Sequence, residues 1–183
     1  MHTDARASLL VALLALAALA APAHAKSAAE IERQAKAALK GLLARNDAAR
    51  SLARDARAVL VFPTIVKGGF LFGGAFGQGA LLAGDRADGY YRTVSASYGL
   101  QAGLQSYGYA LFFMNDAALA YFRKTEGWEV GVGPTLVVAD EGLSGSLSTT
   151  TARSDIYAFF FDQQGLMAGL GLQGTKIFRI HPK

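Results

Sequence analysis

Apolar residues recur at helical spacing in the segment that follows residue 26. The stripe consists of Ile31, Ala35, Ala38, Leu39, Leu42 and Leu43. Ser27 and Glu30 form a capping box, which favours the start of a helix at this point. Asn46 and Asp47 can end this helix and cap a second one at about residues 48–56. The pattern therefore predicts an amphipathic helical arm over residues 26–58.

After residue 58 the sequence becomes β-branched, aromatic and rich in glycine. Within VLVFPTIVKGGFLFGGAFGQGALL, three phenylalanines share one parity and three glycines share the other (Phe70, Phe72 and Phe76; Gly73, Gly77 and Gly79). Side chains alternate between the two faces of a strand, so one face is bulky and the other is bare. Glycine inside strands marks bulges or close backbone approach. We expect such structural roles for Gly69, Gly73, Gly74, Gly77, Gly79, Gly99, Gly103, Gly169 and Gly174.

Further strand patterns fill most of the remaining chain. They cover residues 90–97, 99–105, 107–114, 128–139, 156–161, 166–172 and 176–180. A hairpin turn is expected within AGDRADGYY at residues 83–91, with Asp88-Gly89, and another at residues 162–165. A short helix is expected from Asn115 to a stop at Gly127. The predicted fold class is α+β, with the N-terminal helical arm followed by a Gly-rich antiparallel β body, barrel-like or sandwich, and one inserted helix.

The first 25 residues read as an export signal. Arg6 precedes an apolar run of 13 residues over 9–21, and Pro22 and Ala23-His24-Ala25 supply a break and a cleavage site. The run is shorter than a bilayer span. We therefore expect a signal peptide at 1–25, a single mature domain at 26–183 (arm 26–58, β body 59–183), and export to a bacterial periplasm.

The positive charge is concentrated in the arm. The chain has a formal net charge of +4, and residues 26–58 carry eight basic and four acidic residues, which accounts for the whole excess. A basic amphipathic helix can lie on an anionic membrane. It can equally pack its apolar stripe on the β body and leave its charges in water. Both alternatives remain open from the sequence.

Recognisable catalytic chemistry is scarce. The chain has no cysteine and three histidines, of which only His181 lies in the mature chain, at its end. This leaves no metal-binding spacing and no base for a serine nucleophile. GLGLQG at 169–174 has dinucleotide-binding spacing, but neither a helix nor an acidic residue follows it. We expect no enzyme activity, no cofactor, no metal and no nucleic-acid partner.

Several motifs in order resemble the SYLF domain family. ARAVLVFPTIVKGGFLFGGAFGQGALL resembles the family's opening signature, SYGLQAGLQ resembles its S-x-G-x-Q-x-G-x-Q segment, and FFMND and GLMAGLGLQG match further segments. Ala58 departs from the pattern, where a glycine is usual. The resemblance implies binding to membrane phospholipids, with the N-terminal helical and basic residues involved. For an exported bacterial protein it implies an anionic phospholipid partner and no role in actin regulation.

Five residues are candidates for contact with lipid: Lys36, Lys40, Arg45, Lys67 and Trp128. Lys67 precedes two glycines and can supply a point charge for a phosphate, or can simply be solvated at a strand entrance. Trp128 can sit at a membrane interface or in the core. Two other classes of function stay open: a small outer-membrane β-barrel, and an envelope structural protein that binds another protein.

Overall fold

The computed structural model describes residues 26–69, 72–98, 103–139, 154–164, 172 and 174–183. The arm forms two helices, α2 (Ala28–Arg45) and α3 (Asp47–Asp55). Ser27 caps α2 by accepting a hydrogen bond from the amide of Glu30, and Asn46 caps α3 in the same way through Ala49. The predicted helical arm is therefore confirmed, with boundaries within a residue or two. The expected signal peptide lies outside the described residues.

The body is one curled sheet of eight strands in the order β5-β8-β3-β2-β1-β4-β7-β6. The strands are β1 (Ala58–Gly69), β2 (Phe72–Ala83), β3 (Arg86–Tyr98), β4 (Gly103–Phe113), β5 (Trp128–Glu129), β6 (Leu136–Ala139), β7 (Ile156–Gln164) and β8 (Thr175–Ile180). Every pairing is antiparallel except that of β6 with β7. The predicted α+β class is confirmed.

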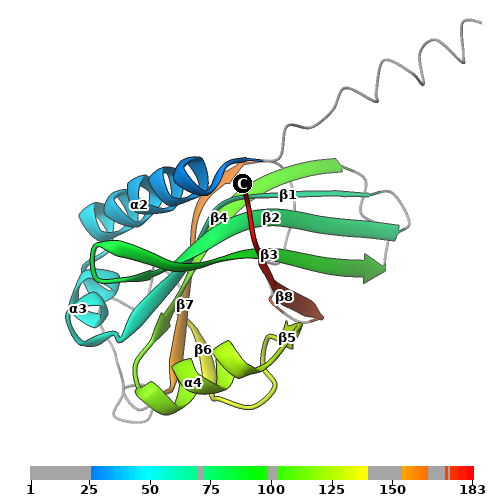
Figure 1. Cartoon of the computed structure of the whole chain (residues 1–183). Helices are drawn as coiled ribbons and strands as arrows, with labels where there is room; N and C mark the ends of the chain where they lie inside the picture. Colours follow the sequence, from blue (N-terminus) through cyan, green and yellow to red (C-terminus); the bar gives the residue numbers. More distant parts are fainter. Residues whose placement is uncertain (1–25, 70–71, 99–102, 140–153, 165–171, 173) are drawn as a thin grey trace, which may run out of the picture.

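Helices cover the two faces of this sheet separately (Figure 1). On one face α2 buries Ile31, Ala35 and Leu42, and α3 buries Ala48 and Ala49, in a cluster with residues of β1, β2, β4 and β7. On the other face α4 (Asp116–Lys124) buries Leu119 and Phe122 in a second cluster that includes Trp128. Because both faces are buried over the middle of the sheet, the central strands are apolar at both parities.

The apolar stripe of α2 therefore packs on the sheet. Its residues are those that the helical spacing selected, and the charged residues Arg33, Lys36 and Lys40 are exposed on the far side of the helix. Of the two alternatives that the sequence left open for the arm, the structure shows packing on the body. None of the helices in the described ranges is long and apolar enough to cross a bilayer.

Three local predictions differ from the structure in position or extent. The expected strand over 128–139 is interrupted between β5 and β6, because Gly131 and Gly133 have φ of 92° and 90°, in the left-handed region that a strand does not use. The hairpin turn expected within residues 83–91 joins β2 to β3, but it lies at Gly84 and Asp85, where Gly84 has φ 61°, and Asp88-Gly89 belongs to β3. Residues 162–164 of the turn expected at 162–165 belong to β7, which continues to Gln164.

The bare face of β2 is filled by β1. A Cβ placed on Gly77 would lie 2.7 Å from the backbone oxygen of Thr64, and one on Gly79 would lie 2.7 Å from Cδ1 of Phe62. Both contacts come from the bulge of β1, where the register with β2 shifts between Val61 and Thr64. The glycines are therefore required for close strand packing, as predicted for Gly77 and Gly79. Gly99 and Gly169 lie outside the described residues.

Candidate functional site

A cleft lies between α2 and the turn that joins β2 to β3. Its volume is about 360 Å³. It is lined by two lysines, three leucines, a glycine and an aspartate: Lys36, Lys40, Leu39, Leu43, Leu82, Gly84 and Asp85. We call this feature the α2 cleft. It combines exposed positive charge with apolar side chains, the combination that an anionic amphiphile requires.

Helical periodicity explains how the α2 cleft is built. Lys36 and Lys40 are four residues apart and so lie on one side of the helix, and Leu39 and Leu43 form a neighbouring row. The two leucines are half-buried against the α2-side core, and Leu82 of β2 is part of that core. The lysines therefore stand at the rim, and the leucines form the apolar wall beneath them.

Lys36 is held in place by an ion pair with Glu32, one helical turn earlier, at 2.7 Å. The hydrogen bond from Lys36 lowers the pKa of the Glu32 carboxyl, with a smaller contribution from the hydroxyl of Tyr90, which donates to Glu32 at 3.3 Å. Lys40 is exposed and has no ion pair with any described residue. Lys40 is consequently the less compensated of the two charges at the cleft.

The other predicted residues lie elsewhere. Arg45 pairs with Asp162 of β7 at 2.8 Å, at the end of α2 away from Ser27. Lys67 is half-buried on β1, opposite Gln105 of β4, and its register places it on the α4 side of the sheet. Only Lys36 and Lys40 are therefore brought together by the fold.

Trp128 belongs to the core. Its side chain is 1% exposed, and its indole N–H donates to the carbonyl oxygen of Val132 at 2.9 Å. Its ring stacks edge-on against Phe122 of α4, with the ring centroids 5.4 Å apart. The prediction of an interfacial tryptophan is corrected by this burial, since the ring is covered and its polar atom is already bonded.

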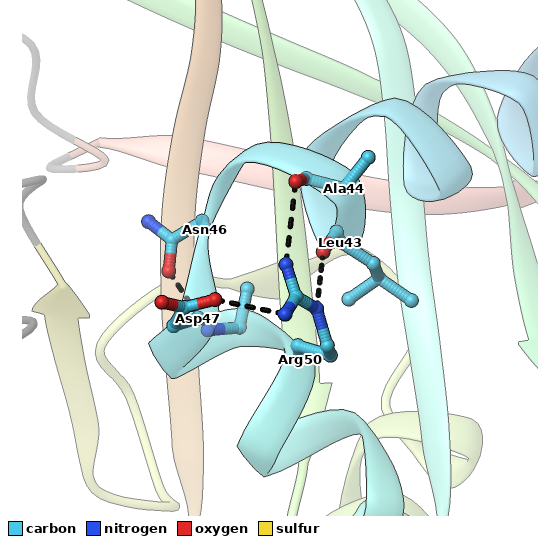
Figure 2. A network of polar contacts seen from close by, with 6 residues as sticks. Leu43, Ala44, Asn46, Asp47 and Arg50 are labelled. Carbon is cyan, nitrogen blue, oxygen red and sulfur yellow. Dashed lines mark hydrogen bonds and ion pairs between the residues drawn. The ribbon is translucent and has the colours of Figure 1, made fainter.

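The corner between α2 and α3 fixes the end of the arm. Figure 2 shows Arg50 of α3 donating to the carbonyl oxygens of Leu43 and Ala44 at 2.8 and 3.2 Å, while it also pairs with Asp47 at 2.9 Å. The carbonyls at a helix C-terminus have no partner within the helix, so Arg50 satisfies two of them. This corner holds the last turn of α2, and with it Leu43 of the cleft, against the sheet.

Sequence reasoning found the helical wall of the cleft but missed the opposite wall. Leu82, Gly84 and Asp85 are about 40 positions further along the chain and contribute through a turn that packs beside α2. The only available signal was the polar turn composition in that region. No periodicity links it to the helix.

The described residues contain no group of three or more histidine, aspartate or glutamate side chains that could hold a metal ion. The α2 cleft offers a positive rim and an apolar wall but no nucleophile with an adjacent base. The arrangement can therefore hold and orient an amphiphile. These features define a binding domain on a helix-covered, curled sheet.

The comparison with protein families agrees with this class. Residues 94–181 match the family model described as Ysc84, Las17-binding protein actin regulator. This match over residues 94–181 agrees with the SYLF domain that the sequence motifs predicted. The matched range begins within β3 and includes β4, α4 and the last four strands. No curated protein matches the chain.

Proposed function

We propose that this protein is a non-catalytic, periplasmic lipid-binding domain that attaches to anionic phospholipid surfaces through the α2 cleft. The observation that carries the proposal is the placement of Lys36 and Lys40 at the rim of a cleft whose wall is formed by Leu39, Leu43 and Leu82. The lysines attract lipid phosphates, and the leucines accept the first methylene groups of an acyl chain.

The structure favours surface attachment over insertion of a free helix. The apolar stripe of α2 is buried against the sheet, so its release would expose Ile31, Ala35 and Leu42 to water or lipid. Fully burying one side chain of the size of leucine or isoleucine stabilises a fold by about 1.5–3 kcal/mol. The arm therefore stays packed on the sheet when the protein binds, with its charged side toward the lipid.

Charge compensation sets the expected strength of this attachment. A lysine near an anionic surface contributes about 1 kcal/mol to binding. This attraction falls off over about one Debye length, and added salt shortens that length. Glu32 compensates Lys36 in part, and Asp85 adds a negative charge to the cleft. We therefore expect moderate, salt-sensitive affinity that depends on the fraction of anionic lipid.

Co-sedimentation with vesicles tests this proposal. The mature chain is mixed with vesicles of neutral phosphatidylcholine, or of the same lipid with a graded share of phosphatidylglycerol, at low and at high salt. Binding should rise with the anionic share and fall with salt. Equal binding to both kinds of vesicle, or no binding to either, would refute it. In the second case the envelope-protein alternative becomes the better account of the domain.

A further inference from the structure

One end of the α2 side of the sheet is apolar and is not covered by any helix that the structure describes. Figure 1 shows α2 lying over one part of the strands, while β1, β2 and β3 extend well beyond it. Three large apolar side chains on this part are exposed: Val66 to 48%, Phe76 to 51% and Leu104 to 73%. We call these three residues the apolar patch.

Strand register places the patch on one continuous surface. Phe76 of β2 is the partner of Val66 on β1 and of Val94 on β3, and Val94 is in turn the partner of Lys176 on β8. Directly paired residues project from the same face of a sheet. Phe76 and Leu82 are six residues apart on β2 and so share a face, and Leu82 lies in the cluster under α2. The row therefore lies on the same face as α2.

Two glycines explain why the patch is open. Leu104 of β4 is paired with Gly68 of β1, and Gly68 is paired with Gly74 of β2. A Cβ on Gly74 would meet only the backbone oxygen of Ser95, at 3.6 Å, so this position has room for a side chain. Because Gly68 and Gly74 have no side chains, Leu104 and Phe76 project above bare backbone. Packing nevertheless does not require a glycine at position 74.

Cationic side chains border the patch on one side. Lys176 ends the row that contains Phe76, and Arg92 lies in the next row with its guanidinium 5.3 Å from the ring centroid of Phe178. Lys176 is 3.9 Å from Glu129, a long ion pair between exposed groups. Such a pair contributes little, so Lys176 can turn to another anion. A positive border beside an apolar centre fits a surface with phosphates outside and hydrocarbon beneath.

We infer that the apolar patch is the part of the protein that enters the lipid bilayer, with Arg92 and Lys176 on the phosphates beside it. This inference rests on the proposed function and adds to it the face that penetrates the membrane. The patch lies on the same side of the sheet as α2. An uncovered apolar surface on central strands is otherwise unfavourable in water.

Tryptophan fluorescence tests the inference directly, because the only natural tryptophan, Trp128, is buried and serves as a constant background. Phe76→Trp and Leu104→Trp each place a reporter in the patch. Val132→Trp is the matched control, since Val132 is 52% exposed but lies in the segment between β5 and β6, away from the patch. Co-sedimentation is measured on the same samples, which contain phosphatidylglycerol vesicles with and without brominated acyl chains.

The patch reporters should shift to shorter wavelength and be quenched by brominated chains, and the control should show neither change. Phe76→Ser with Leu104→Ser should weaken vesicle binding about tenfold, as expected for the loss of two partly inserted apolar side chains. Sedimentation with vesicles but no change at either reporter would overturn the inference and leave the proposed function intact. Absence of sedimentation would overturn both. A shift that appears without lipid as protein concentration rises would assign the patch to a second copy of the chain.

Discussion

Replacement of Gly79 by alanine tests the close packing of β1 on β2. A Cβ at this position would lie 2.9 Å from the carbonyl carbon of Val61 and closer still to its oxygen. Because the obstructing atoms are backbone, rotation of a side chain cannot relieve the contact, and the β1 bulge must move. Overpacking of this kind costs about 1–3 kcal/mol, and we expect the upper end. For a chain of this size that lowers Tm by about 6–12 °C.

Gly74→Ala is the matched control on the same strand. Its Cβ would have one neighbour, the Ser95 oxygen at an ordinary 3.6 Å. Alanine also restricts the unfolded chain, so we expect stability to be unchanged or raised by up to about 1 kcal/mol. Urea and thermal unfolding followed by circular dichroism measure both variants. Equal stability of Gly79→Ala and Gly74→Ala would refute the role assigned to the bulge.

Three further predictions concern other parts of the fold. Asn46→Ala removes the cap of α3 and should cost about 1 kcal/mol in urea unfolding, whereas Asn46→Asp should keep most of the stability. Hydrogen bonds from Asn115, and then from Thr135, hold the pKa of Asp155 below its usual range. The stabilisation from Asp155 is therefore complete above the unfolded carboxyl pKa of about 3.9 and is lost as pH falls through the lowered folded value. Asp155→Asn should accordingly be less stable at pH 7 and lose less on acidification, which urea midpoints from pH 7 to pH 2 would show. In the wild type, Trp128 should resist quenching by acrylamide and keep its emission maximum when anionic vesicles are added; a marked shift would contradict its place in the core.

The helices were predictable because their signals are local. The capping residues Ser27, Asn46 and Asn115 each accept a hydrogen bond from the amide three residues later, as their identity suggested. The apolar stripe of α2 fell at positions that the structure buries (Ile31, Ala35 and Leu42) or half-buries (Ala38, Leu39 and Leu43). Helix α4 ends at Lys124, before the expected stop, because Thr125 already forms the C-cap. Gly127 with φ 62° instead shapes the link to β5.

Strand pairing was harder to predict from the sequence than the helices, because strand register depends on residues far apart in the chain. The sequence indicated that another part of the backbone comes close to Gly77 and Gly79. It did not show that this part is the β1 bulge. It left Trp128 either at an interface or in the core, the commoner place for such a ring, and the approach of α4 to the sheet decides for the core. Lys36 and Lys40 lie at the α2 cleft, whereas Lys67 lies on the α4 side of the sheet. This division follows from the fold of β1 and could not be predicted from composition.

The most direct test of the account is the affinity for phosphatidylglycerol vesicles after removal of the two cleft lysines. Lys36→Gln with Lys40→Gln is compared with Arg54→Gln with Arg57→Gln, which removes the same charge from exposed positions outside the cleft. We expect the cleft variant to bind on the order of tenfold more weakly, because a lysine near the surface contributes about 1 kcal/mol and the compensated Lys36 contributes less. The control should stay close to the wild type. Equal losses in both variants, or none in the cleft variant, would contradict the account.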